Sequence, residues 1–209
     1  MTFTASIARP DAPIGIFDSG VGGLSVLRHI RAQLPQEDLM YFADSAYAPY
    51  GDKTEQQVVD RSLAITAFLL QQGAKALVVA CNTATIAAIK ALRARYPDLP
   101  IVGVEPGLKP AASISRNGKI AVLATERALR GDKLLALREQ VSAATGATFI
   151  LQPCIGLADR IEQCELGNDP LDATSAMLER YIAPMLEQGV DTLVLGCTHY
   201  PFVQDAIVR

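Results

Sequence analysis

Short apolar segments alternate with longer amphipathic segments along the 209-residue chain. The apolar segments lack the two-residue alternation of half-exposed strands, which indicates parallel strands covered on both faces. The amphipathic segments repeat apolar residues every three or four positions, as helices do. Strands alternating with helices predict an α/β fold with parallel sheets and right-handed crossovers. Strands are predicted at residues 14–17, 39–42, 77–79, 101–104, 120–125, 148–151 and before Cys197, and helices at 24–34, 54–72, from 85, after 125, 155–163 and 171–188.

One segment occurs twice. Residues 72–83 read QGAKALVVACNT and residues 188–199 read QGVDTLVLGCTH, so the offset is 116 residues both at the glutamines and between Cys81 and Cys197. A similarity at a fixed offset indicates duplication. We therefore predict two similar lobes related by a pseudo-two-fold, each a parallel sheet flanked by helices, with the active site between them. The predicted lobes are residues 13–106 and 107–209, and residues 1–12 form a loose tail.

Composition narrows the class of protein. The net charge is −3 and no basic patch is present, which argues against a nucleic-acid partner. No apolar run approaches the ~20 residues of a membrane helix, and residues 1–12 lack the apolar core of a signal peptide. We therefore expect a cytoplasmic protein with no membrane contact. The four cysteines have no C-x-x-C spacing, so we expect free thiols and no metal site.

Cys81 and Cys197 are the candidates for chemistry, because ligands of open α/β sheets bind at the carboxyl ends of strands. Cys154 and Cys164 are interpreted as buried structural residues. Two thiols that approach one carbon from opposite faces suit inversion of a stereocentre: one, as thiolate, removes a proton and the other delivers one. Asp18, Glu162 and His199 are candidates for setting that asymmetry, although the two carboxylates also fit capping or surface roles and the histidine a purely polar one.

A dinucleotide site is the competing interpretation. Gly20, Gly22 and Ser25 follow the first strand in a G-x-G-x-x-S pattern, and Asp44 ends the next strand, where a ribose-binding acid would lie. However, the third glycine is missing, and Asp18 would repel a pyrophosphate. The fingerprint is therefore weak.

The motifs together resemble those of the glutamate racemases, members of the cofactor-independent aspartate/glutamate racemase superfamily. The resemblance covers almost the whole chain. It is carried by Ile16-Phe17-Asp18-Ser19-Gly20-x-Gly22-Gly23, Tyr41-x-Ala43-Asp44, Pro49-Tyr50-Gly51, Cys81-Asn82-Thr83-Ala84, Glu105-Pro106 and Gly196-Cys197-Thr198-His199-Tyr200-Pro201.

The resemblance implies an isomerase that makes D-glutamate for peptidoglycan, and hence for cell-wall synthesis and cell shape, as a homodimer without any cofactor. It implies catalytic roles for Cys81 and Cys197, assisted by Asp18, Glu162 and His199. The residues implied to bind glutamate are Asp18, Ser19, Pro49, Tyr50, Gly51, Asn82, Thr83, Thr125, Thr198 and His199.

Departures from the family pattern leave alternatives open. Family members usually continue for roughly fifty residues more, in a segment that returns to the first lobe, and we expect that segment to be absent here. Ala128 stands where a second threonine is frequent, and Gly107 replaces an alanine. An aspartate or broad-specificity racemase, and a shortened non-catalytic copy that acts as a binding protein, therefore remain alternatives.

Overall fold

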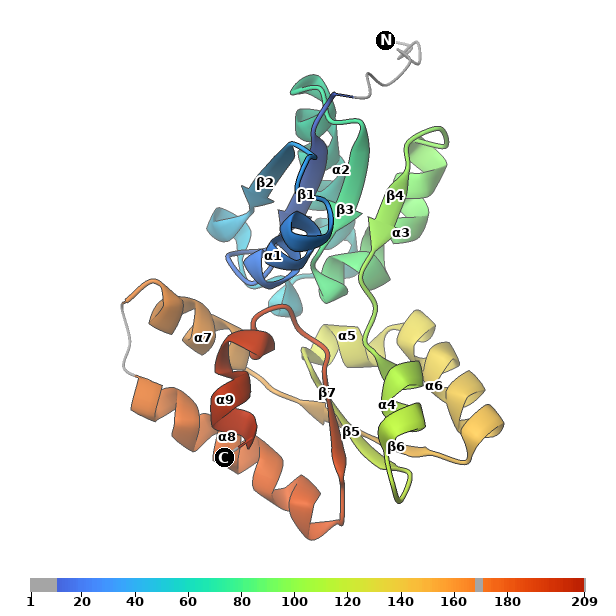
Figure 1. Ribbon diagram of the computed structural model, residues 1–209, viewed down its shortest axis with the longest axis vertical. Coiled ribbons are helices and arrows are strands. Elements are labelled where there is room, and N and C mark those ends of the chain that lie inside the picture. The colour runs from blue at the N-terminus through green and yellow to red at the C-terminus, as the bar shows by residue number, and fades with distance from the viewer. Residues whose placement is uncertain (1–10, 168–170, 209) are drawn as a thin grey trace. The chain divides into compact units, whose positions relative to one another are not determined.

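The computed structural model describes residues 11–167 and 171–208, so most of the predicted tail, residues 1–10, lies outside the described part. The chain divides into two compact units, unit 1 (Met1–Val104) and unit 2 (Glu105–Arg209). Each unit is built around its own parallel sheet (Figure 1).

Unit 1 contains a four-stranded sheet in the order β2-β1-β3-β4, with every neighbouring pair parallel. Its central strands β1 and β3 are largely buried, and Ile16 and Phe17 of β1 have no exposed surface. The helices α2 and α3 pack against each other beside this sheet. The elements of unit 1 are β1 (Ile14–Asp18), α1 (Leu24–Gln33), β2 (Leu39–Ala43), the 3₁₀ turns η1 (Ser45–Tyr47) and η2 (Tyr50–Asp52), α2 (Glu55–Gln71), β3 (Ala76–Val79), α3 (Asn82–Arg95) and β4 (Ile101–Gly103).

Unit 2 contains a three-stranded parallel sheet in the order β6-β5-β7. The central strand β5 is buried from Ile120 to Ala124. The elements of unit 2 are α4 (Leu108–Ile114), β5 (Lys119–Ala124), α5 (Glu126–Arg130), α6 (Asp132–Thr145), β6 (Thr148–Pro153), α7 (Leu157–Glu165), α8 (Leu171–Glu187), β7 (Thr192–Leu195), the 3₁₀ turn η3 (Tyr200–Val203) and α9 (Gln204–Val208).

The predicted α/β class and parallel sheets are confirmed, and the bounds of the predicted strands agree with the structure to within two residues. The helix predicted from residue 85 is wrong at its start, because α3 begins at Asn82. The sulfur of Cys81 accepts a hydrogen bond from the Ala84 amide at 3.5 Å and so caps the helix three residues earlier than the apolar pattern indicates. The helix α4 was not predicted. Within the described ranges no helix is long and apolar enough to cross a membrane.

Candidate active site

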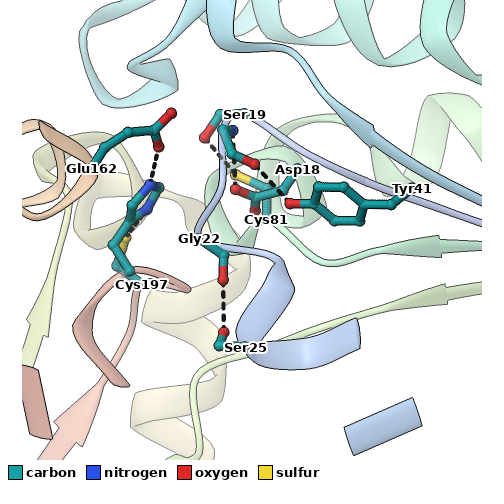
Figure 2. A network of polar contacts seen from close by, with 10 residues as sticks. Asp18, Ser19, Gly22, Ser25, Tyr41, Cys81, Glu162 and Cys197 are labelled. Atoms are coloured by element: carbon teal, nitrogen blue, oxygen red, sulfur yellow. Dashed lines mark hydrogen bonds and ion pairs between the residues drawn. The ribbon is translucent and has the colours of Figure 1, made fainter. Parts of the chain in front are cut away.

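In unit 1, the sequence-predicted residues Ser19 and Cys81 meet at the carboxyl edge of the sheet. The strands β1 and β3 are parallel neighbours with Phe17 opposite Val79, so the residues that follow them emerge side by side. The Cys81 thiol donates a long hydrogen bond to the Ser19 hydroxyl, with 3.9 Å between Sγ and Oγ (Figure 2). Ser19 and Cys81 lie 62 positions apart in the sequence. The parallel pairing of β1 with β3 brings them together.

The surroundings of Cys81 favour a thiolate. The residue is 5 % exposed and lies at the N-cap of the 14-residue helix α3, where the aligned peptide dipoles leave partial positive charge. The Ala84 amide donates directly to the sulfur. A helix N-terminus and an amide donor both stabilise a negatively charged sulfur. These two backbone features would stabilise the thiolate form of this cysteine.

The glycine turn after β1 packs closely around Asp18. This carboxylate is fully buried and accepts a hydrogen bond from the Gly20 amide at 3.2 Å. The Tyr41 hydroxyl donates to the Gly20 carbonyl at 2.7 Å (Figure 2). A Cβ on Gly23 would lie 2.6 Å from both the Asp18 Cβ and the Tyr41 Oη, so only glycine fits there. Within this turn, Gly23 thus has a packing role beside a buried acid, and the Gly20 amide binds that acid directly.

The loop that carries Pro49, Tyr50 and Gly51 is tied to Asp44, a residue to which sequence reasoning gave no part in the racemase site. The Tyr50 hydroxyl donates to Asp44 Oδ2 at 2.6 Å. Arg61 of α2 donates to both carboxylate oxygens, from Nη2 at 2.6 Å and from Nε at 2.9 Å. Asp44 is therefore already occupied by two side chains, which argues against its binding a ribose. Arg61 carried no sequence signal beyond its place on a helix.

The first turn of α3 holds the two other predicted residues of this edge. Asn82 and Thr83 are 5 % and 4 % exposed, and the Asn82 amide donates to the Val104 carbonyl at 3.3 Å. Both residues lie within α3, ahead of the predicted helix start at residue 85, because Cys81 caps the helix. The amide and hydroxyl groups of this turn are thus held next to the sulfur.

In unit 2, Cys197 is joined to a histidine and a glutamate. The His199 ring lies between them, with Nδ1 3.6 Å from the Cys197 Sγ and Nε2 in a short hydrogen bond with the Glu162 carboxylate (Figure 2). All three side chains are buried. Glu162 orients the ring and favours a proton on Nε2, so that Nδ1 faces the Cys197 sulfur as an acceptor. The helix α7 carries Glu162, which contacts His199 although the two residues lie 37 positions apart in the sequence.

Thr125 and Thr198 complete the predicted set of unit 2. Thr125 follows β5, the neighbour of β7, and its hydroxyl accepts from the Ala128 amide at 3.2 Å as the N-cap of α5. Thr198 is 5 % exposed and lies between Cys197 and His199. The departure at Ala128 therefore leaves the backbone contact of Thr125 in place.

Cys154 and Cys164 are the other two cysteines of the chain, and neither is assigned to the site. Burial raises the pKa of the Cys154 thiol to about 12, and this thiol donates to the Gln152 carbonyl at 3.5 Å. The Cys164 sulfur lies 3.1 Å from the Thr174 hydroxyl. A thiol with so high a pKa stays protonated near neutral pH and is a poor base. Among the described residues no group of three or more histidine, cysteine or acidic side chains is arranged to hold a metal ion.

Comparison with known proteins gives one consistent family. The Asp/Glu/hydantoin racemase family matches residues 14–209 of the chain. The glutamate racemase of Pseudomonas aeruginosa is 54% identical over 203 residues, which span 97% of this chain and 75% of that protein.

Two solved structures are similar as well. One is Escherichia coli glutamate racemase in complex with L-glutamate and the activator UDP-MurNAc-Ala, with a TM-score of 0.84 and 36% identity over 94% of this chain and 73% of that one. The other is Francisella tularensis glutamate racemase in complex with D-glutamate, with a TM-score of 0.77 and 28% identity over 95% of this chain and 73% of that one. With two thiols at matching strand ends and a family match over nearly its whole length, the chain belongs to the Asp/Glu/hydantoin racemase family.

Proposed function

We propose that the chain is a glutamate racemase that interconverts L- and D-glutamate by proton transfer at Cα, without a cofactor. The observation that carries the proposal is the matched placement of two cysteines, Cys81 after β3 and Cys197 after β7. In each unit this strand is the parallel neighbour of the unit's first strand. The names of the similar proteins, and the L- and D-glutamate bound to two of them, support glutamate as the substrate.

In the proposed mechanism both thiols serve the same Cα from opposite sides. The thiolate of one cysteine removes the Cα proton, and the electron pair stays on the substrate as a carbanion conjugated with the α-carboxylate. The thiol of the other cysteine then donates its proton to the opposite face, which inverts the configuration. At the end the first cysteine is a thiol and the second a thiolate, so the reverse reaction starts from that state.

The neighbours of each sulfur fit this exchange of protonation states. At Cys197, His199 accepts the thiol proton while Glu162 stabilises the resulting imidazolium. At Cys81, the Ala84 amide and the start of α3 stabilise the thiolate directly. Proton abstraction from carbon requires a base, and each sulfur has a neighbouring group that can serve its change of protonation state.

Substrate binding is assigned to the polar groups around the two sulfurs. Hydroxyl and amide donors suit the two carboxylates of glutamate, and the Asp18 carboxylate suits its ammonium group. The assigned donors are Ser19, Asn82, Thr83, Thr125 and Thr198, together with His199 and the loop residues Tyr50 and Gly51. Pro49, which has no N–H, is assigned to the lining of the site.

We place this activity in the supply of D-glutamate for peptidoglycan, in the cytoplasm, with a homodimer as the working form. The resemblance of the motifs to the glutamate racemases supports all three statements. The Escherichia coli relative takes UDP-MurNAc-Ala, a muramic acid nucleotide, as activator, and this supports the link to the cell wall. No nucleic acid or membrane partner is proposed.

The decisive test is deuterium incorporation at Cα when the purified protein acts on L- or D-glutamate in D₂O. Replacing Cys81 or Cys197 by serine should lower racemisation by about 10³-fold or more, because an alcohol is a far weaker acid than a thiol. Cys164→Ser, which changes a sulfur outside the proposed site, is the matched control and should keep wild-type rates. Full racemisation by either Cys81→Ser or Cys197→Ser would end the two-thiol mechanism.

The same assay separates the alternatives. Equal turnover of aspartate and glutamate would indicate a broad-specificity racemase, and preference for aspartate would replace the substrate proposed here. A folded wild-type chain that exchanges no Cα proton of either amino acid would instead favour a non-catalytic binding protein.

A further inference from the structure

The loop between β2 and α2, residues 44–53, is held by one buried carboxylate. Asp44 is 3 % exposed, and its amide donates to the Asp18 carbonyl at 3.0 Å, which continues the pairing of β2 with β1. From that fixed point the chain makes two short 3₁₀ turns, η1 and η2, neither of which has a side-chain cap. The shape of the loop therefore depends on what Asp44 binds.

Three donors converge on the Asp44 carboxylate. Arg61 binds both oxygens as a fork, at 2.6 and 2.9 Å, and the Tyr50 hydroxyl donates at 2.6 Å to the oxygen that Arg61 Nε also contacts. The guanidinium carbon lies 3.7 Å from the centre of the Tyr47 ring, which it covers as a cation–π partner. Arg61 of α2 thus contacts Tyr47, the last residue of η1, directly, and is linked through Asp44 to Tyr50, the first residue of η2.

The arrangement needs an arginine rather than any cation. A buried carboxylate without a paired charge is costly, and the planar fork of arginine satisfies both oxygens at once while its face stacks on an aromatic ring. Lysine supplies a point charge with neither the fork nor the stacking face. The hydrogen bond with Asp44 raises the pKa of Arg61, which further favours the charged guanidinium.

Tyr50 links Asp44 to the hydrophobic core that contains Cys81. Its side chain is 2 % exposed and belongs to the same hydrophobic core as Cys81, and η2 packs against α3. Burial, and then the Asp44 acceptor, raise the pKa of the Tyr50 hydroxyl, so it remains a donor. The position of this loop relative to the sulfur is therefore set by a chain of contacts that begins at Arg61.

We infer that Arg61 is a positioning residue for substrate binding: through Asp44 it fixes the Tyr47–Gly51 loop in the conformation that receives glutamate beside Cys81. The inference rests on the proposed function, since it assigns the loop to glutamate. Arg61 does not touch the reacting atoms, so its loss should weaken binding of the ground state and the transition state together. Such a loss raises KM and leaves kcat nearly unchanged.

The test compares Arg61→Gln and Arg61→Lys with Arg93→Gln, all in the full chain. Arg93 is the matched control, because it lies on α3 of the same unit and donates to a backbone carbonyl, that of Ile101, at 3.1 Å. Racemisation of L-glutamate gives KM and kcat, and hydrogen exchange of residues 45–53, read by mass spectrometry, gives the order of the loop without any need for activity. We expect KM to rise about tenfold in Arg61→Gln, with kcat within about threefold of wild type. Arg61→Lys should recover only part of this loss, and exchange in residues 45–53 should be faster in both Arg61 variants than in Arg93→Gln.

A second comparison shows whether Arg61 acts through Asp44. Asp44→Asn removes the charge that Arg61 compensates, so the double variant with Arg61→Gln should raise KM no further than the worse single variant. Full additivity of the two changes would overturn the chain of contacts proposed here. So would an unchanged KM, or loop exchange equal to wild type, in a folded Arg61→Gln. If the wild-type chain itself shows no racemisation, the proposed function fails, and the assignment of glutamate to this loop fails with it, whatever the exchange data show.

Discussion

The two units present their thiols from similar sheets but in different chemical surroundings. The strand order β2-β1-β3 of unit 1 corresponds to β6-β5-β7 of unit 2, and in both units the cysteine of the repeat lies just beyond the third of these strands. Unit 1 adds β4 at the edge of its sheet, beside β3 (Figure 1). The described part of unit 2 has no strand at the matching position beside β7.

The difference lies in what surrounds the sulfur. Cys81 caps a helix of 14 residues and receives a backbone amide, whereas Cys197 precedes a short 3₁₀ turn and contacts an imidazole. A helix terminus stabilises the anion with fixed dipoles and takes up no proton. An imidazole held by a glutamate takes up the proton itself. The duplicated scaffold thus fixes where each sulfur lies, and the neighbouring groups decide how its proton is handled.

The largest expected effect comes from removing the imidazole of unit 2. We expect His199→Asn to lower kcat/KM for glutamate by about 10²–10³-fold, the range for loss of one acid–base group. Ser19→Ala, the corresponding change beside Cys81, also removes a proposed substrate donor and should cost about tenfold, because the Ala84 amide and the α3 terminus remain. The measurement is circular dichroism of glutamate during racemisation in each direction.

Two features make this result decisive. Since the enantiomers have equal free energies in water, kcat/KM must fall by the same factor in both directions, and unequal losses would reveal an assay fault. His29→Asn is the control, because His29 is the only other histidine in the sequence and is exposed on α1. If Ser19→Ala lost as much activity as His199→Asn, the two sulfurs would not differ in the way argued here.

A smaller effect should come from the residue before each cysteine. Gly196 and Ala80 are related by the offset of the repeat, yet only Ala80 has room for its Cβ. A Cβ on Gly196 would lie 2.9 Å from both the Ala124 Cβ and the Leu123 carbonyl oxygen of β5. We expect Gly196→Ala to destabilise the protein by about 1–3 kcal/mol, as overpacking does, and to lower kcat by displacing Cys197.

The reciprocal change sharpens this prediction. Ala80→Gly removes one buried methyl group and should cost about 1 kcal/mol without a clash. Urea unfolding followed by circular dichroism gives both values. Adding Ala124→Gly should rescue part of the Gly196→Ala loss, because it removes one of the two colliding atoms. A Gly196→Ala variant as stable as wild type would show that the approach of β7 to β5 is loose.

The strands of both units and the matching positions of Cys81 and Cys197 could be predicted from the sequence. Apolar runs without alternation predicted the strands, and the repeat predicted two cysteines at matching strand ends. These signals are local, or repeat at a fixed spacing, so a single sequence records them. The early start of α3 was missed because a sulfur atom caps it, and cysteine is not among the residues that normally signal a helix start.

The contacts between distant residues were not accessible without coordinates. Glu162 and His199 were each candidates for assisting the thiols, but their pairing was not predicted, and Arg61 did not enter at all. Both depend on which faces of α7 and α2 turn toward the carboxyl edge of the sheet, and helical periodicity alone does not fix this. The unpredicted residues are therefore those that tie one element to another through a single side chain.

The smallest expected effect concerns the start of the third strand. Lys75, just before β3, and Asp191, just before β7, occupy equivalent positions of the repeat. Lys75 pairs with Glu37 at 2.5 Å, whereas Asp191 accepts from the Ser115 hydroxyl at 2.6 Å and from the Arg116 and Asn117 amides at 2.8 and 2.9 Å. The hydrogen bond from Ser115, followed by that from the Asn117 amide, holds the pKa of Asp191 well below its usual range.

The sign of the pH dependence follows from that lowered pKa. A carboxyl whose folded pKa lies below its unfolded value, near ~3.9, adds stability that is fully present above the unfolded value and is lost as pH falls through the folded one. Asp191→Asn should therefore lower the urea midpoint slightly at pH 7, and its deficit relative to wild type should shrink as the pH falls below about 4. Asp98→Asn, an exposed acid of unit 1, should change neither quantity. A deficit that stayed constant down to acid pH would mean that the Asp191 side chain contributes by its shape rather than by its charge.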